Sequence, residues 1–483
     1  MTTPAAAKTP HKNWTLLAVC LGTFMLLMDI TVVFVALPDI RSSLHTSFTD
    51  VQWTIDAYSL SLAALLLATG SLADVFGRRR VFAIGLAIFT VGSLLCGLST
   101  SGTELIIWRA VQGIGGATVF STSLALLAQT FHGRERGFAF SVWGAVIAVS
   151  SALGPLVGGV LTTELSWHWI FFVNIPIGIF AIVITLTQVA EFRPSQHRRI
   201  DLVGFVLFTL GLTALVYGLI ESGFKGWGSG EVLVSLIIAV VSLAAFPVAE
   251  NFIEQPMFKL DLFKKPTFVG GSIAAFGMNG SLYSLFLFIV LYFENALHYS
   301  ALGCGVRLAI ITAGSLITAI PAGRLSAHVP VRYLISPGLL LVGIGLLLMR
   351  GLSADTSWTH LIPGFLIAGL GSGMVNAPLA STAVGVVQPQ DAGMASGINS
   401  TFRQIGVATA VAALGSIFAT RLRGATHATL AAHYASALDE LALITGVLAL
   451  VAAALTLVLI RQKDFIAHAP APEGQGSPAV AAH

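Results

Sequence analysis

Long apolar segments separated by short polar loops make up most of this chain. Each segment approaches the ~20 residues that a helix needs to cross a hydrocarbon core of ~30 Å. We therefore predict an all-α membrane protein. The pattern predicts fourteen transmembrane helices, at residues 14–38, 51–73, 81–99, 104–131, 137–162, 168–189, 201–221, 231–250, 267–293, 302–324, 331–350, 359–386, 393–420 and 436–460.

The composition fits a membrane location. Hydrophobic side chains make up 55% of the 483 residues and charged side chains only 10%, whereas soluble proteins carry about 25% charged residues. The net charge of +3 is spread over the loops, so we expect no nucleic-acid partner. The three cysteines lie inside apolar segments without paired spacing, so we expect no disulfide framework and no metal site.

The sequence carries no motif that indicates an enzyme. The glycines of 113–116 do not follow a strand, so they do not form a dinucleotide-binding loop, and we expect no cofactor. The first apolar segment, 14–38, is long enough to span a bilayer and leads directly into further spans. We expect it to remain as the first helix instead of being removed as a signal peptide.

The charges of the loops predict the orientation, because cytoplasmic loops retain an excess of Lys and Arg. With both termini cytoplasmic, the loops predicted to lie outside hold only Arg41, Lys225, Arg350, Arg421 and Arg423. The segments predicted to lie inside hold seventeen basic residues: Lys8, Lys12, Arg78, Arg79, Arg80, Arg134, Arg136, Arg193, Arg198, Arg199, Lys259, Lys264, Lys265, Arg324, Arg332, Arg461 and Lys463.

Two faint internal repeats indicate two homologous halves. Residues 70–79 and 323–332 share a glycine, a leucine and a final arginine at matched positions, and the glycine-rich segments 113–117 and 369–373 repeat at nearly the same offset. The predicted organisation is a cytoplasmic tail (1–13), a first six-helix bundle (14–190), a linker with two extra transmembrane helices (191–266), a second six-helix bundle (267–460) and a disordered cytoplasmic tail (461–483).

Five charged residues lie too deep inside predicted spans to be assigned to loops, and a charge there costs about 2.5–3.5 kcal/mol and is a functional candidate. Asp29, Asp56 and Arg109 fall in the outer half of the first bundle, and Gln112 lies one helical turn from Arg109. We interpret these four residues as a proton-binding group. The alternative is a permanent ion pair that joins helices, and for Asp56 a hydrated side chain near the surface. The remaining two charges are Arg307 and Arg403.

A tight basic turn separates the second and third predicted helices, with Gly70, Asp74, Gly77 and Arg78 at characteristic positions. It resembles the cytoplasmic loop motif of the major facilitator superfamily. The resemblance implies that Asp74 locks a cytoplasmic gate by docking near residues 392–396. The alternative is a helix-capping acid beside arginines that only fix the topology.

Further segments resemble the fourteen-span drug:proton antiporter branch of this superfamily. They are the first helix around Asp29, the Arg109–Gly116 segment, the segment 167–178, and a stretch of small residues with a proline in the fifth helix, which permits close helix packing. Phe34 and His168 depart from the pattern of this branch. The stretch in the fifth helix resembles the antiporter motif of exporters, with the motif residues Gly154, Pro155, Gly158 and Gly159. The alternative interpretation is that these small residues only serve helix packing.

The resemblance implies the major facilitator fold with fourteen transmembrane helices, and a proton-coupled antiporter that exports small hydrophobic or cationic compounds, as in drug or antibiotic efflux. Its partners are a small-molecule substrate, protons and the lipid bilayer of the inner (plasma) membrane, and we expect a monomer. An importer on the same fold and a non-transporting sensor are the alternatives. Residues that we expect to line a substrate cavity, unless they only pack, are Phe24, Phe34, Tyr58, Phe120, Asn279, Tyr283 and Arg403.

Overall fold

The structure is a computed structural model of the 483-residue chain. It describes residues 12–131, 133–191, 201–254, 256, 258–326, 328–388, 392–426 and 429–465. Within this part of the chain all regular secondary structure is helical. The predicted all-α class is therefore confirmed, while most of the predicted tails lies outside the described residues.

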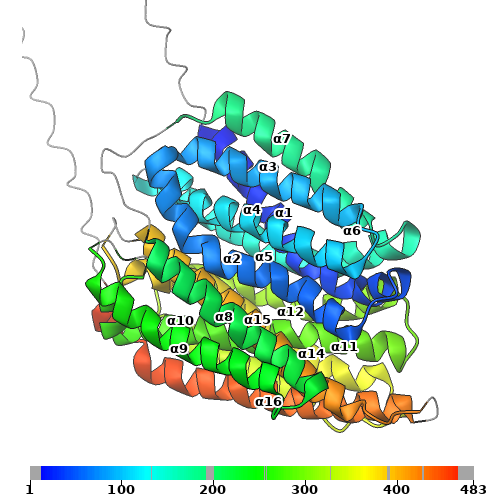
Figure 1. The fold of residues 1–483 in the computed structure, drawn as a ribbon. Coiled ribbons are helices and arrows are strands. Elements are labelled where there is room, and N and C mark those ends of the chain that lie inside the picture. Colours follow the sequence, from blue (N-terminus) through cyan, green and yellow to red (C-terminus); the bar gives the residue numbers. More distant parts are fainter. Residues whose placement is uncertain are drawn as a thin grey trace, which may run out of the picture.

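Sixteen α-helices run through the described chain, most of them roughly side by side (Figure 1). They are α1 (Lys12–Ser43), α2 (Phe48–Phe76), α3 (Arg78–Gly97), α4 (Gly102–Thr130), α5 (Gly133–Glu164), α6 (Trp169–Phe172), α7 (Asn174–Gln188), α8 (Leu202–Lys225), α9 (Gly230–Phe252), α10 (Pro266–Met278), α11 (Ser284–Asn295), α12 (Ala301–Leu325), α13 (Arg332–Leu348), α14 (Ile362–Gly385), α15 (Ala392–Arg421) and α16 (Leu430–Leu459).

The described residues contain 11 helical segments that are long and apolar enough to cross a membrane. Two of these segments join consecutive helices. α6 and α7 form one segment, Trp169–Gln188, and a π-helical turn at Asn279–Tyr283 links α10 to α11 in the segment Pro266–Asn295. The protein is thus a multi-pass membrane protein.

The structure differs from the prediction at the end of the chain. Residues Gln462–Asp464 form a short 3-10 helix, although the sequence predicts disorder from residue 461. The hydroxyl of Thr267 donates to Asp464 Oδ2 at 2.7 Å and accepts from the backbone N–H of Arg461 at 2.7 Å. These bonds between the start of α10 and the end of α16 order residues that have no hydrophobic periodicity of their own.

Helices α1–α7, which we call the first helix group, pack on one another through small residues. α4 lies against both α2 and α3, and α1 lies against α5 and α7. A Cβ atom built on Gly115 of α4 would lie 2.4 Å from the backbone N of Phe89 in α3. Only glycine permits this approach, because real Cβ atoms do not come so close to backbone.

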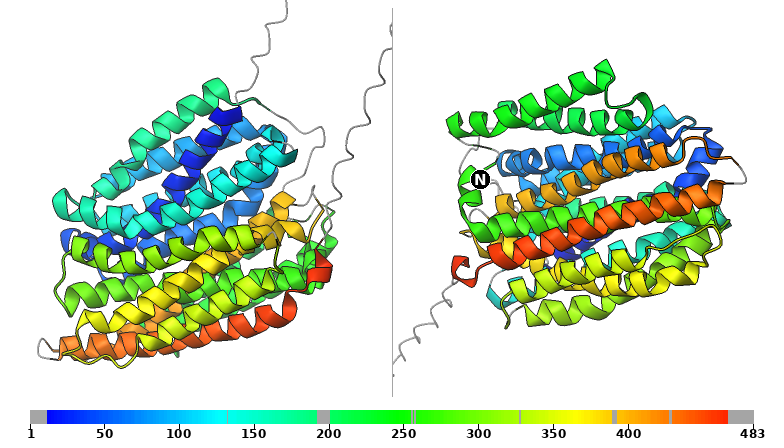
Figure 2. Two further views of the ribbon diagram at one scale, coloured as in Figure 1. Left: turned by 180° about the vertical axis from the view of Figure 1, so that it is seen from behind. Right: turned by 90° about the horizontal axis from the view of Figure 1, so that it is seen from below.

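Helices α10–α16, the second helix group, repeat this arrangement. α14 packs on α12 and α13, and α16 packs on α10 and α13. A Cβ atom on Gly345 of α13 would lie 2.5 Å from the backbone N of Ala368 in α14. α8 and α9 pair with each other beside the two groups, where α8 contacts both α2 and α15 (Figure 2).

The two helix groups meet tightly at one end. We call the end where α1 begins and α16 ends the terminal face, and the other end the opposite face. Near the opposite face, a Cβ atom on Gly305 of α12 would lie 2.3 Å from the carbonyl oxygen of Pro155 in α5. The backbone N–H of Leu302 donates to Thr163 Oγ1 at 2.9 Å, and the rings of Phe48 and Phe418 stack at 5.6 Å. These contacts close the opposite face between the groups.

This closure predicts the effect of a wedge at Gly305. A Gly305→Val substitution should force α5 and α12 apart at the opposite face, because the added Cβ atom would overlap the carbonyl of Pro155. A disulfide between Thr163→Cys and Leu302→Cys, in a background without the native cysteines, should then form several-fold less. Gly144→Val on α5 is the matched control, since nothing lies within 4 Å of its Cβ position. Equal cross-linking in both variants would contradict the close contact.

Candidate functional site

A buried ion pair lies inside the first helix group. Asp29 of α1 and Arg109 of α4 are each only 1% exposed, and Arg109 Nη1 lies 2.5 Å from Asp29 Oδ2. The two residues are eighty positions apart, so the packing of α1 and α4 brings them together. A carboxylate and a guanidinium this far from water stabilise each other only if their remaining polar atoms are also bonded.

The other oxygen of Asp29 is bonded by two side-chain amides. Gln112 Nε2 donates to Asp29 Oδ1 at 2.8 Å, and Asn174 Nδ2 of α7 donates to the same atom at 3.1 Å. Gln112 Oε1 in turn accepts from Arg109 Nη1 at 2.5 Å, and Ser93 Oγ of α3 accepts from Gln112 Nε2 at 2.7 Å. The carboxylate is therefore held by hydrogen bonds from α4 and α7.

The remaining contacts of Arg109 come from α2 and α6. Its Nε donates to the backbone carbonyl of Thr54 at 3.1 Å, and its Cζ lies 4.2 Å from the ring centre of Tyr58 and 5.9 Å from that of Phe171. A guanidinium over an aromatic ring gains a cation–π interaction that strengthens when water is excluded. Removing either member of such a buried pair costs about 3–5 kcal/mol, because the other charge is left unpaired.

This network joins most helices of the first helix group at one point. It can stabilise the negative charge of Asp29 away from water. Alternatively, when Asp29 takes up a proton, Arg109 can keep its contacts with the neighbouring amide, carbonyl and ring. Both of the roles considered from the sequence, a proton site and a permanent helix-joining pair, are compatible with this geometry.

Asp56 does not belong to this network. It is 0% exposed, and both of its carboxylate oxygens are buried without a hydrogen-bond partner among the described residues. Its position on α2 faces the second helix group, because residues on the same side of α2 bond to α15. Gln52 Nε2 donates to the carbonyl oxygen of Val411 at 3.2 Å, and Thr401 Oγ1 donates to the carbonyl oxygen of Ala63 at 3.4 Å. The alternative of a hydrated surface side chain is therefore wrong for this closed arrangement.

The glycine-rich turn between α2 and α3 lies at the terminal face. Gly77 has a φ of 100°, which side chains other than glycine rarely adopt, and the carboxylate of Glu191 fills the space beside its Cα. Arg78 Nη1 donates to Ala125 O of α4 at 3.1 Å. Gly70 contacts only Ser121 Cβ, at 3.9 Å from its Cβ position. The side chain of Asp74, on which the gate prediction depends, lies outside the described part of the structure.

The four residues of the proposed antiporter motif are divided between two interfaces. Cβ atoms on Gly154 and Gly158 would overlap Thr31 and Val32 of α1, so these two glycines serve packing inside the first helix group. A Cβ atom on Gly159 would lie 2.8 Å from the carbonyl of Ala301 in α12, and the carbonyl of Pro155 meets Gly305. Gly159 and Pro155 thus take part in the contact between α5 of the first helix group and α12 of the second.

A central cavity of about 80 Å³ lies between the two helix groups. This is the space of roughly two or three liquid waters at ~30 Å³ each, far less than the ~300–1,000 Å³ of typical ligand sites. A larger compound therefore requires the groups to separate. The lining residues are Leu27, Ile30, Thr31, Ile147, Asn279, Leu282, Tyr283, Phe286, Ile311, Thr312, Ser315, Ser372, Asn376, Arg403, Gln404 and Val407.

Of the residues expected to line a substrate cavity, Asn279, Tyr283 and Arg403 line this one. The aromatic residues of the first helix group have other contacts. Tyr58 lies against Arg109, the ring centres of Phe34 and Phe286 are 6.3 Å apart, and those of Phe120 and Trp143 are 5.6 Å apart. Phe24 packs against the main hydrophobic core.

Sequence reasoning missed several polar residues of both regions. Ser93, Thr54 and Asn174 complete the Arg109 network, and Asn376 and Gln404 line the cavity. Asn174 falls in a segment that resembles the antiporter branch, but its amide carries no signal by itself. Among the described residues, no group of three or more His, Cys, Asp or Glu side chains could hold a metal ion.

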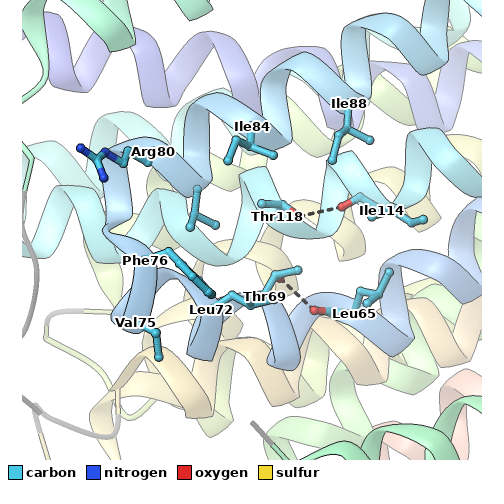
Figure 3. Close-up of a pocket in the computed structure, with 11 residues that line it drawn as sticks. Leu65, Thr69, Leu72, Val75, Phe76, Arg80, Ile84, Ile88, Ile114 and Thr118 are labelled. Carbon is cyan, nitrogen blue, oxygen red and sulfur yellow. Dashed lines mark hydrogen bonds between the residues drawn. The ribbon is translucent and has the colours of Figure 1, made fainter. Parts of the chain in front are cut away.

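A larger cavity, of about 490 Å³, lies away from this central region. Figure 3 shows it between α2 and α3, with Ile114 and Thr118 of α4 behind it and Arg80 at one end. Its wall includes Phe76 and Ile84, whose side chains are largely exposed on the outside of the first helix group. The cavity therefore opens sideways, and it does not reach the buried ion pair or the central cavity.

Comparison with known proteins gives a consistent result. The chain matches the model of the Major Facilitator Superfamily over residues 19–411 and 272–482. It is 34% identical over 427 residues to the multidrug resistance protein Stp of Mycobacterium tuberculosis (strain CDC 1551 / Oshkosh), covering 88% of this chain and 79% of that protein. It is 36% identical over 446 residues to the cephamycin export protein CmcT of Amycolatopsis lactamdurans, covering 90% of each.

The puromycin resistance protein pur8 of Streptomyces alboniger is 36% identical over 434 residues, which cover 88% of this chain and 84% of that protein. Among solved structures, an inward-facing, unoccupied bacterial homologue of the human lysosomal transporter Spinster superposes with a TM-score of 0.62 at 17% identity, covering 96% of this chain and 100% of that one. The structural similarity supports the fold. The match to the family model and the similarity to the sequence relatives together assign the chain to a family. The chain belongs to the Major Facilitator Superfamily and is a membrane transporter.

Proposed function

We propose that this transporter exports small hydrophobic compounds in exchange for protons, as a drug or antibiotic efflux pump. The single observation that carries the proposal is the buried Asp29–Arg109 pair inside a helix group that packs against a second one. An intramembrane acid is costly and is retained where it serves ion or proton movement. Relatives named for multidrug resistance, puromycin resistance and cephamycin export support the direction and the class of cargo.

We further propose that the chain is a member of the fourteen-span drug:proton antiporter branch. α2 and α5, with 29 and 32 residues, exceed the length of a span, and the 17 residues of α13 reach its lower limit of about 17. Adding these three to the 11 segments identified by length and hydropathy would give fourteen crossings. The domains would then be two six-helix bundles, 14–190 and 267–460, with α8 and α9 in the linker 191–266.

The terminal face is proposed to be cytoplasmic, in the inner (plasma) membrane of a bacterium, with the protein acting as a monomer. The excess of Lys and Arg in the loops of this face supports the orientation. Arg78, Arg79 and Arg80 at the start of α3 and Lys264 and Lys265 before α10 are examples. The closed opposite face would then be the outer side, and the structure would correspond to a state that is shut toward the outside.

Two acids have different parts in the proposed exchange. Asp29 shares its charge with Arg109, so protonation of Asp29 would break a balanced pair and free the guanidinium. Asp56 lies between the helix groups, where an ionised carboxylate without a hydrogen bond is unfavourable. A proton that Asp56 takes up from the outside would therefore allow the outer side to close, and release of this proton toward the inside would favour opening of the outer side again. Gln112 would hold Asp29 and Arg109 in register.

In this scheme, the movement of the two helix groups prevents substrate and proton from being bound at the same time. Each proton that moves down a membrane potential of 100 mV contributes about 2.3 kcal/mol. The turn at Gly70, Asp74, Gly77 and Arg78 is proposed to control the inner gate, and Gly159 and Pro155 the outer contact. No catalytic group or cofactor is required, since the driving force comes from the proton gradient.

The first prediction concerns Asp29. An Asp29→Asn substitution should lower proton-driven uptake of a cephamycin into inside-out vesicles roughly tenfold or more, because the amide cannot take up a proton. Exchange of external for internal cephamycin without a pH gradient should persist. The matched control is Glu164→Gln, which changes an exposed carboxylate at the end of α5. Full coupling in Asp29→Asn would remove the assigned role.

The second prediction concerns Asp56. Spin labels at Leu165 and Ser353, exposed positions near the opposite face in the two helix groups, should report a longer distance in alkaline than in acidic buffer. Ionised Asp56 should favour separation of the groups, because the charge is dry when they are closed. Asp56→Asn should keep the short distance in both buffers. A variant that responds to pH as the wild type does would exclude Asp56 as the responding group.

The third prediction concerns topology. A green fluorescent protein fused after Phe465 should fluoresce, whereas alkaline phosphatase fused at the same position should be inactive, because both termini are proposed to be cytoplasmic. A phosphatase fusion within the 226–229 loop, on the opposite face, is the control and should be active. The reverse pattern would invert the proposed orientation.

A further inference from the structure

We propose that the central cavity selects substrates that carry an anionic oxygen group, such as a carboxylate, on an otherwise apolar body, with Arg403 as the residue that binds this group. The inference rests on the proposed export function and names the chemical class of its substrate. It replaces the sequence-based expectation of cationic compounds. It comes from a comparison of Arg109, which is buried, with Arg403, which is partly buried in the wall of the cavity.

Arg109 and Arg403 differ in their partners. Arg109 has a carboxylate, a side-chain amide, a backbone carbonyl and an aromatic ring around its guanidinium. For Arg403 the structure gives one hydrogen bond, from Nη1 to Asn376 Oδ1 at 3.1 Å, and no ion pair within 4.0 Å among the described residues. A guanidinium has five N–H donors, so most of the donors of Arg403 are available to a ligand.

Among the residues that the structure describes, no carboxylate is available in the cavity to balance this charge. None of the lining residues is acidic, and Asp29 on α1 is held by Arg109, Gln112 and Asn174. The neighbours of Asp29 in the sequence, Leu27 and Ile30, line the cavity instead. A charged side chain within a membrane-spanning segment normally has a partner of opposite sign. The structure assigns that partner to the transported compound.

The polar groups of the cavity lie on one side of it. Arg403, Gln404, Asn376 and Asn279 all come from the second helix group. The first helix group contributes mainly Leu27, Ile30 and Ile147, with Thr31 as its polar member. A compound with a polar, anionic end and an apolar body matches this division.

The backbone beside the cavity is irregular. A π-helical turn at Asn279–Tyr283 lies between α10 and α11, and its residues Asn279, Leu282 and Tyr283 line the cavity. Such turns often occur at functional sites, since they give up a regular hydrogen-bond ladder. The rings of Tyr283 and Phe286 meet edge to face at 5.5 Å and form an aromatic wall beside the polar groups.

The volume of the cavity fits a ligand that has a small polar end and a larger apolar body. About 80 Å³ accommodates a carboxylate-sized group but not a drug-sized compound. The polar end can therefore be held within the second helix group, while the body occupies space that opens as the first helix group moves away. A cationic compound would bring a second positive charge next to an unneutralised guanidinium, and this repulsion would disfavour it.

The test uses three probes with the same fluorescent body: dansylglycine, which is anionic; dansylglycinamide, which is neutral; and dansyl-ethylenediamine, which is cationic. Their binding to the purified full-length protein is followed by dansyl fluorescence. We expect the wild type to bind dansylglycine roughly tenfold more tightly than the neutral probe, and the cationic probe most weakly. Arg403→Gln should remove this preference, lowering affinity for dansylglycine while leaving dansylglycinamide nearly unchanged.

Two further variants separate a binding role from a structural one. Arg403→Lys keeps the charge but not the planar fork, and should retain part of the preference for the anion. Arg307→Gln, on α12, is the control and should behave as the wild type, because Arg307 lies against Tyr299 and Trp358 instead of the cavity. Excess chloride should not displace dansylglycine if the apolar body contributes to binding.

The outcomes are decisive in both directions. Equal binding of the three probes, tightest binding of the cation, an unchanged preference in Arg403→Gln, or absence of binding of all three probes to the wild type would overturn the proposal. Displacement by chloride would show that Arg403 binds a small inorganic anion only. Because these are binding measurements, they can succeed even if proton-coupled flux through Asp29 fails, and they can fail while that coupling holds.

Discussion

The structure depends on one electrostatic constraint: a carboxylate and a guanidinium placed where water cannot stabilise either of them. Asp29 and Arg109 satisfy this constraint only together, and the side chains of Gln112, Asn174 and Ser93 complete their bonds. The residues that meet here come from α1, α3, α4 and α7, while α2 contributes a backbone carbonyl. The rotation of each of these helices about its axis is therefore fixed by the same small group of polar atoms.

Close backbone contact is the second requirement, because the ion pair cannot form unless the helices approach one another. Hydrophobic burial does little to drive helix association in lipid, so small residues and van der Waals contact must do so. Gly115 against Phe89 serves this purpose inside the first helix group, and Gly305 against Pro155 serves it between the groups. The first contact is surrounded by side chains of its own group. The second joins the two helix groups, which the proposed transport cycle would separate, so the same chemistry would serve a fixed contact in one place and a separable one in the other.

The other three charges that fall deep inside predicted spans have unequal surroundings. Arg307 lies over the rings of Tyr299 and Trp358, Arg403 shares a cavity with uncharged polar side chains, and Asp56 lies unpartnered between the helix groups. Aromatic contact can satisfy a cation, whereas the other two require something from outside the chain, a proton for Asp56 and an acceptor for Arg403. These two requirements fall at the boundary between the groups, where alternating access would supply them in turn.

The sequence by itself determined the helical class, most helix positions and the family, because span length, loop charge and short glycine-rich motifs are local properties. It also selected Asp29, Arg109 and Gln112, since charges in apolar segments are conspicuous and the last two are one helical turn apart. Only the tertiary structure brought Asn174, Ser93 and Thr54 to them, separated Asp56 from them, and placed Arg403 in a cavity without an acid. Those outcomes depend on how helices distant in sequence rotate and pack, which no local pattern encodes. The ordering of residues 461–465 has the same origin, because Thr267 at the start of α10 supplies the bonds that hold them.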